Sequence, residues 1–160
     1  MGTDPIRVRV AVALGSNLGD REAHLAAAAS HLASFLADLR LSPFFDTAPV
    51  DVAPQPRFLN AAAVGWTSLP ARKLLERLLA IEAAHGRERP HIGAPRTLDL
   101  DLILYGDAVV DAPGLQVPHP RFRQRRFVLE PLAAVAPDLE DPVTGKRVRD
   151  LLAELAQRWD

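Results

Sequence analysis

Leucine and aspartate alternate in the segment LDLDL (98–102), and the chain then continues with apolar residues. Strict alternation is typical of a β-strand, because successive side chains of a strand point to opposite faces of the sheet. We therefore expect a strand over Thr97–Tyr105. One of its faces carries Asp99 and Asp101, which a strand places roughly 7 Å apart. The other face is expected to carry Leu98, Leu100, Leu102 and Leu104.

The rest of the chain shows strand and helix patterns in turn. Alternating or apolar runs predict strands over Ile6–Leu14, Leu39–Thr47 and Phe58–Thr67, the second broken at Pro43. Helical patterns run from Asp20 to about Leu36 and from Pro70 to Gly86, with weaker ones at Pro131–Ala136 and Val148–Leu155. The order β-α-β-β-α-β predicts an α+β fold, a ferredoxin-like antiparallel sheet with its helices on one face and a C-terminal extension. We expect a single domain over residues 1–160.

Composition limits the class of protein. The chain is 48% hydrophobic and 24% charged, which fits one globular domain with a real core. Its formal net charge of -1 gives no field that would draw it to nucleic acid or to a membrane surface. It has no cysteine, no signal-peptide pattern in MGTDPIRVRV and no apolar run near the ~20 residues of a membrane span. We expect a cytoplasmic monomer.

The pair Asp99 and Asp101 is unusual for a strand. Aspartate is a poor strand former, and two like charges on one face repel each other. A solvated sheet face is the alternative interpretation, and it explains one aspartate better than two in register. Carboxylate oxygens are the ligands that Mg²⁺ prefers, and that ion is often shared with substrate phosphates. The pattern therefore favours a cation site, although an Asp-x-Asp pair alone is a signal of moderate specificity.

Seven arginines flank this strand in the sequence: Arg87, Arg89, Arg96, Arg121, Arg123, Arg125 and Arg126. Arginines on loops are usually solvated, but guanidinium groups around metal-binding carboxylates are what a polyphosphate site requires. His119 adds a further donor, although a lone histidine is more often structural. The glycine-rich phosphate motifs are absent from the sequence. GSNLGD (15–20) is therefore interpreted as a turn and helix cap.

Four segments occur together in a characteristic order: ALGSNLGD, PQPRFLNAA, GAPRTLDLDLILYG and VPHPRFRQRRFVLEPL. In order and spacing they resemble the 6-hydroxymethyl-7,8-dihydropterin pyrophosphokinase family of folate biosynthesis, over about residues 10–152. The resemblance implies transfer of pyrophosphate from ATP to the hydroxymethyl group of the pterin, with release of AMP. It also implies that Asp99 and Asp101 hold two Mg²⁺ ions.

The resemblance further assigns roles around the two substrates. Arg87 and Arg96 would act on the transferring phosphates. Glu82, Arg89, His119 and Arg125 would bind ATP, although Glu82 could equally be a solvated carboxylate at a helix end. Thr47, Val50, Phe58, Asn60 and Phe127 match the positions that bind the pterin. Without the resemblance, both phenylalanines would be assigned to the core, whereas a polar Asn60 opening an apolar strand needs hydrogen-bond partners.

The sequence departs from the family pattern in three places. Gly93 and Ala94 stand where an aromatic residue is common, Pro120 follows His119 in place of an aromatic residue, and Ala48 replaces a proline. The first lies in the loop Arg87–Arg96, whose arginines we expect to close over the phosphates. No general base is apparent.

Two other functions remain open at this point. One is a ferredoxin-like domain that senses a nucleotide or a metal without catalysis, because a fold alone does not fix function. The other is an Asp-x-Asp nucleotidyltransferase, which would release pyrophosphate instead of AMP.

Overall fold

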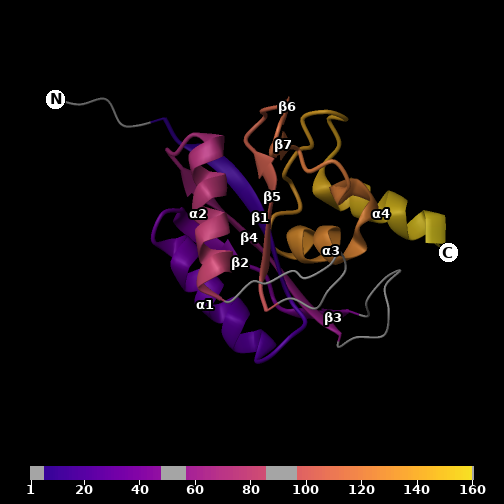
Figure 1. The fold of residues 1–160 in the computed structure, drawn as a ribbon. Helices are drawn as coiled ribbons and strands as arrows, with labels where there is room; N and C mark the ends of the chain where they lie inside the picture. The colour runs from indigo at the N-terminus through magenta and orange to yellow at the C-terminus, as the bar shows by residue number, and fades with distance from the viewer. Residues whose placement is uncertain (1–5, 48–56, 86–96, 160) are drawn as a thin grey trace.

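The computed structural model describes residues 6–47, 57–85 and 97–159, which are organised by one antiparallel sheet (Figure 1). Across this sheet the strand order is β2 (Ala37–Leu41), β4 (Phe58–Thr67), β1 (Val8–Ser16) and β5 (Asp99–Tyr105), and β3 (Phe45–Thr47) also pairs with β4. The predicted break at Pro43 is confirmed, because it separates β2 from β3.

Helices α1 (Arg21–Ala33) and α2 (Ala71–Ala84) pack on one face of the sheet (Figure 1). Asp20 caps α1 as predicted, with its side chain accepting a hydrogen bond from the backbone N–H of Ala23 at 3.1 Å. Helix α1 ends earlier than the predicted Leu36, and Gly86 lies outside the described residues. The core on this face includes Val10, Val12, Leu14, Leu25, Leu32, Leu74, Leu78 and Leu100.

The two main helices thus lie on one face of the sheet, as predicted, but the sequence did not predict that the C-terminal extension covers the other face. Helices α3 (Arg126–Val135) and α4 (Val148–Trp159) cover the opposite face, so the sheet lies between two helical layers (Figure 1). Strand β4 explains the difference, because its run Ala61–Val64 is apolar at every position and both faces of it are buried. This second core includes Ala11, Ala62, Val64, Ile103, Phe122, Leu129, Leu132 and Leu155.

The segment after β5 also contains more regular structure than the sequence predicted. A short hairpin joins β6 (Val110–Ala112) to β7 (Leu115–Val117) through Pro113 and Gly114, whose φ of 74° suits glycine. A turn of 3₁₀ helix follows at Phe122–Gln124, and α3 begins before the predicted helical turn and includes Pro131. No helix in the described part of the chain is long and apolar enough to cross a bilayer.

A β-bulge interrupts the pairing of β5 with β1. Leu102 lies opposite Val12, but Leu104 lies opposite Ala11, so Ile103 is an extra residue in the strand. Leu104 therefore joins the second core beside α3 and α4. The prediction that it shares a face with the earlier leucines of the strand is wrong, because alternation alone cannot reveal a bulge.

Candidate active site

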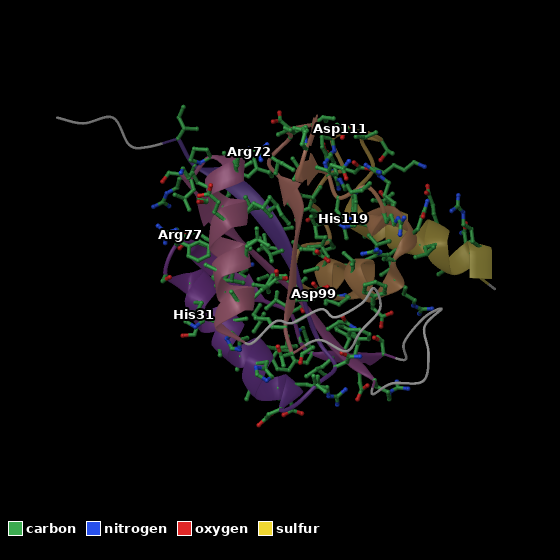
Figure 2. All side chains as sticks on the ribbon, viewed as in Figure 1. His31, Arg72, Arg77, Asp99, Asp111 and His119 are labelled. Carbon is green, nitrogen blue, oxygen red and sulfur yellow. The ribbon has the colours of Figure 1, made fainter. Side chains whose placement is uncertain are left out.

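A cleft of about 460 Å³ lies along β5, at the edge of the sheet, between α2 on one side and the β6–β7 hairpin with the segment after it on the other. In the side-chain view, Asp99 lies on the lower part of β5 and His119 on the segment beside it (Figure 2). The polar residues that line the cleft are Glu82, Asp99, Asp101, Gln116 and His119. Pro120 lines it as well. The cleft thus combines acidic groups and an imidazole from elements far apart in the sequence.

Asp99 and Asp101 lie on the same face of β5, as predicted. They are opposite Gly15 and Ala13 of β1, before the bulge, and both are half-buried. In the described ranges, no three histidine, aspartate or glutamate side chains are grouped so that they could hold a metal ion. Two carboxylates fit a Mg²⁺ site of the kind that is completed by water and substrate phosphate, because Mg²⁺ is rarely enclosed by protein ligands alone.

Glu82 is a buried residue of α2, with only 2% of its surface exposed. Its Oε2 accepts a hydrogen bond from the backbone N–H of Leu100 at 2.7 Å. The alternative interpretation of Glu82 as a solvated carboxylate at a helix end is therefore wrong. Because Leu100 stands between Asp99 and Asp101, this contact holds the edge of β5 where both metal-binding candidates project.

His119 is fixed by its backbone and by its ring. Its N–H donates to the carbonyl of Ile103 at 2.9 Å, and its Nδ1 accepts from the backbone N–H of Arg121 at 3.2 Å. Burial lowers the pKa of His119, the positive charges of Arg125 and Arg121 lower it further, and Asp99 opposes them. A neutral imidazole is thus favoured, with Nε2 as its hydrogen-bond donor to a ligand.

Two of the arginines that flank β5 in the sequence form ion pairs within the protein. Arg123 is bound through Nε and, at 2.8 Å, through Nη2 to the fully buried Asp141. Arg126 forms an ion pair of 2.8 Å with Glu130 one turn along α3. These two arginines are thus occupied by carboxylates of the protein itself.

Arg125 is a described candidate for phosphate binding. Its Cζ lies 5.5 Å from the centre of the Phe127 ring, so a predicted ATP-binding residue contacts a predicted pterin-binding one. Arg87, Arg89 and Arg96 lie outside the described residues, as do Val50 and the departures at Ala48, Gly93 and Ala94.

The candidate pterin residues gather where β3, β4 and α3 meet. Asn60 is buried, and its Nδ2 donates to the Thr47 hydroxyl at 2.6 Å. Phe58 lies opposite Thr47 in the β3–β4 pair and two residues before Asn60, so both side chains project from the same face of β4. Phe127 lies in the first turn of α3 and packs partly against the second core.

Gly15 separates Asn60 from Asp99, and the sequence interpretation missed its importance. It pairs with Asn60 of β4 on one side and with Asp99 of β5 on the other. A Cβ atom on Gly15 would lie 3.1 Å from Oδ1 of Asn60. GSNLGD was interpreted as a turn and helix cap, and Asp20 does cap α1, but Gly15 belongs to β1. A glycine within a strand often marks such a close approach.

Comparison with known families identifies the family of the chain. Residues 11–137 match the model of the 7,8-dihydro-6-hydroxymethylpterin-pyrophosphokinase (HPPK) family. The chain belongs to this family. That range includes the cleft residues and the Gly15 row, whereas Asp141 and α4 lie beyond it.

Relatives from bacteria agree with this HPPK membership. A 2-amino-4-hydroxy-6-hydroxymethyldihydropteridine pyrophosphokinase of Pseudomonas aeruginosa is 45% identical over 148 residues, which cover 91% of this chain and 90% of the relative. The enzyme of the same name from Methylorubrum extorquens is 43% identical over 155 residues, covering 92% and 93% of the two chains.

Solved structures of HPPK-DHPS from Plasmodium falciparum share the fold. One of them superimposes with a TM-score of 0.77 at 14% identity, over 97% of this chain. This chain spans only 45% of that longer one, and at this identity the likeness concerns the fold alone.

Proposed function

We infer that this chain transfers the β,γ-pyrophosphoryl group of ATP to the hydroxymethyl oxygen of 6-hydroxymethyl-7,8-dihydropterin, a step of folate synthesis. The pterin oxygen forms a bond to the β-phosphorus and loses its proton, while the bond from that phosphorus to the bridging α,β-oxygen breaks and AMP leaves. The observation that supports the proposal is the row Asn60–Gly15–Asp99, in which one residue separates the amide proposed to bind the ring from the carboxylate proposed to bind metal.

We propose that Asp99 and Asp101 hold two Mg²⁺ ions with the triphosphate. Bound there, Mg²⁺ would neutralise phosphate charge and lower the pKa of the attacking hydroxyl. The contribution of the chain is to fix both carboxylates on one face of β5, with Glu82 holding the strand between them.

Cationic and neutral donors then bind the phosphates. The charge of Arg125 lowers the pKa of His119 and that of Asp99 opposes it, so both charged groups act on the imidazole of His119. The family resemblance adds Arg87, Arg89 and Arg96 to this set. Planar guanidinium groups bind phosphate oxygens in pairs and stabilise the charge as it moves.

The pterin is proposed to bind on the other side of Gly15. Asn60 and Thr47, already joined by a hydrogen bond, can present donors and acceptors to the polar edge of the ring. Phe58 and Phe127 are proposed to stack on its faces, and Val50 to contact its edge. A flat ring held in this way would direct its hydroxymethyl group toward Asp99.

The remaining features of the proposal concern the whole chain. The order β2-β4-β1-β5 supports a ferredoxin-like arrangement, in which the fourth strand of the β-α-β-β-α-β unit lies beside the first and the third beside the second. We propose one domain over residues 1–160, acting as a cytoplasmic monomer that does not bind nucleic acid.

A product assay tests the reaction. Incubation with Mg²⁺, ATP and the pterin alcohol should give AMP and the pterin diphosphate in equal amounts, observed by ³¹P NMR. No AMP should form without the pterin, and the Asp99→Asn variant should form it about 10³-fold more slowly or slower still. Release of inorganic pyrophosphate would indicate a nucleotidyltransferase. Binding of ATP without any turnover would indicate a sensing domain and would overturn the proposal.

A further inference from the structure

A second cavity, of about 550 Å³, lies at the opposite end of β1 and β4 from the catalytic cleft. Its lining includes Arg9 of β1, Arg40 of β2 and Trp66 of β4. Arg9 lies six residues before Gly15 on β1, a separation of roughly 20 Å at about 3.3 Å per residue. Nothing bound here could contact Asp99.

The three side chains project from one face of the sheet. Arg9 is directly opposite Trp66, and Arg40 is directly opposite Val64. Val64 and Trp66 are two residues apart on β4, so their side chains point the same way, and cross-strand partners share that face. Arg9 is therefore the cross-strand neighbour of Trp66 on β1, and Arg40 lies diagonally across from it on β2.

Both the ring and the two cations are available to a ligand. Trp66 is 39% exposed, which is high for so large an apolar residue. In the described part of the chain, neither Arg9 nor Arg40 makes a side-chain hydrogen bond or an ion pair. Asp38, an acidic residue of the lining, lies 3.9 Å from Arg7. The two guanidinium groups thus leave their donors to solvent or to a bound anion.

We propose that this cavity binds a flat aromatic anion. Its ring stacks on Trp66, because indole faces attract other π-systems, and its carboxylate or phosphate bridges Arg9 and Arg40, whose planar forks match either group. The site goes beyond the proposed reaction and does not depend on it, since no residue of the catalytic cleft takes part.

NMR spectroscopy of the full chain tests the site directly. The chain has two tryptophans, so the Trp159→Phe variant assigns the indole N–H signal of Trp66 in a ¹H–¹⁵N spectrum. The probes are 4-aminobenzoate for an aryl carboxylate and AMP for a nucleotide phosphate, with 4-aminobenzamide and adenosine as neutral counterparts. We expect a saturable shift of the Trp66 signal with at least one anion and none with its neutral counterpart.

Variants then separate this site from the catalytic cleft. Arg9→Gln and Arg40→Gln should each weaken the anion about tenfold or more, because a charge-assisted pair of hydrogen bonds is lost. Asp99→Asn should leave the affinity unchanged. Arg40 is exposed on an edge strand, so its variant should fold even if Arg9→Gln does not. No saturable shift with either anion, an unchanged affinity in Arg40→Gln, or loss of the shift in Asp99→Asn would each overturn the proposal.

Discussion

Asn60 of β4 and Asp99 of β5 lie on either side of the same β1 residue, Gly15. Neighbouring strands are about 4.8 Å apart, so the two residues are separated by roughly 10 Å of sheet. Gly15 has no side chain to fill that interval, and Asn60 Oδ1 would be crowded by one. A substrate ring held at Asn60 can therefore extend across Gly15 toward the metal-binding candidates.

The first prediction concerns Gly15 itself. Gly15→Ala should displace the amide of Asn60 by a few tenths of an ångström and raise the Kd for the pterin about tenfold, through a weakened hydrogen-bond pair. ATP binding should change little. Calorimetry with each ligand separately provides the measurement, and an equal loss for both ligands would contradict this role.

A double-mutant cycle shows whether Gly15 acts through Asn60. Asn60→Ala alone should weaken pterin binding by about 1–3 kcal/mol, because polar edge groups of the ring lose their partner. Gly15→Ala added to Asn60→Ala should then cost little more, since the crowded oxygen is gone. Fully additive effects would mean that the methyl group obstructs the ligand directly.

The second prediction concerns the two aspartates. Asp99→Asn and Asp101→Asn should each lower kcat by about 10³-fold or more, equivalent to about 4 kcal/mol of transition-state stabilisation, because each removes a charged metal ligand. Both side chains are only half-buried, so the melting temperature should stay close to that of the wild type. Turnover near the wild-type rate at saturating Mg²⁺ in either variant would refute the metal assignment.

The third prediction separates support of β5 from ligand contact by Glu82. Glu82→Ala leaves the buried N–H of Leu100 without its acceptor, which should cost about 1–3 kcal/mol of unfolding free energy. Glu82→Gln keeps an acceptor oxygen and should retain most of that stability. Urea denaturation of the two variants measures the difference. Equal destabilisation by both would show that the charge of Glu82, and not its hydrogen bond, matters.

The fourth prediction concerns the ion pair between Arg123 and Asp141. Asp141 is fully buried, and burial alone would raise its pKa. Hydrogen bonds from Arg123, Thr144 and the Val143 backbone reverse this and lower the pKa. Arg123→Ala would leave a buried carboxylate without its main partner, so the unfolding free energy should fall by about 3–5 kcal/mol.

Arg126 provides a matched control on the neighbouring helix. Its ion pair with Glu130 is exposed, so Arg126→Ala should change stability by no more than about 0.5 kcal/mol. Similar small losses in Arg123→Ala and Arg126→Ala would show that the buried pair is not stabilising.

The fifth prediction concerns pH. His85 Nδ1 lies 2.9 Å from His24 Nδ1, and the His31 ring is also near. Burial lowers the pKa of His85, and charge on His24 and His31 lowers it further. Because the unfolded chain takes up this proton first, His85 contributes stability above its ordinary pKa of 6.5, and this contribution is lost as the pH falls below that value.

Denaturation midpoints measured between pH 7.5 and pH 5 check this sign. The wild type should lose stability toward acid pH, and His85→Gln should lose less over the same range. An identical slope in the two proteins would remove His85 as a source of the pH dependence.

Strong local patterns made the order of elements predictable. Alternation identified β5, Pro43 marked the break between β2 and β3, and Asp20 marked the start of α1. The sequence did not predict the second helical layer. Both faces of Ala61–Val64 are buried because helices pack on each of them, and the alternation of residues along the sequence does not reveal this.

The site was predictable at the level of residue types, and its internal contacts were not. Asp99 and Asp101 stand out in the sequence, and Asn60 is conspicuous in an apolar strand. Nothing local indicates that Arg123 pairs with Asp141, 18 residues away, or that Glu82 is bound to the strand edge. Such contacts depend on tertiary packing, which brings together residues that are distant in the chain.

The bulge at Ile103 shifts the alternation of faces along β5 by one residue. Before it, odd-numbered positions of the strand face α3 and α4, where the acidic pair stands, and after it Leu104 takes that face. A one-residue deletion or insertion between Asp101 and the bulge would leave the composition nearly unchanged. It would nevertheless either cancel the register shift or turn both carboxylates toward the apolar layer beneath α1 and α2. This short stretch should therefore accept substitutions much more readily than changes of length.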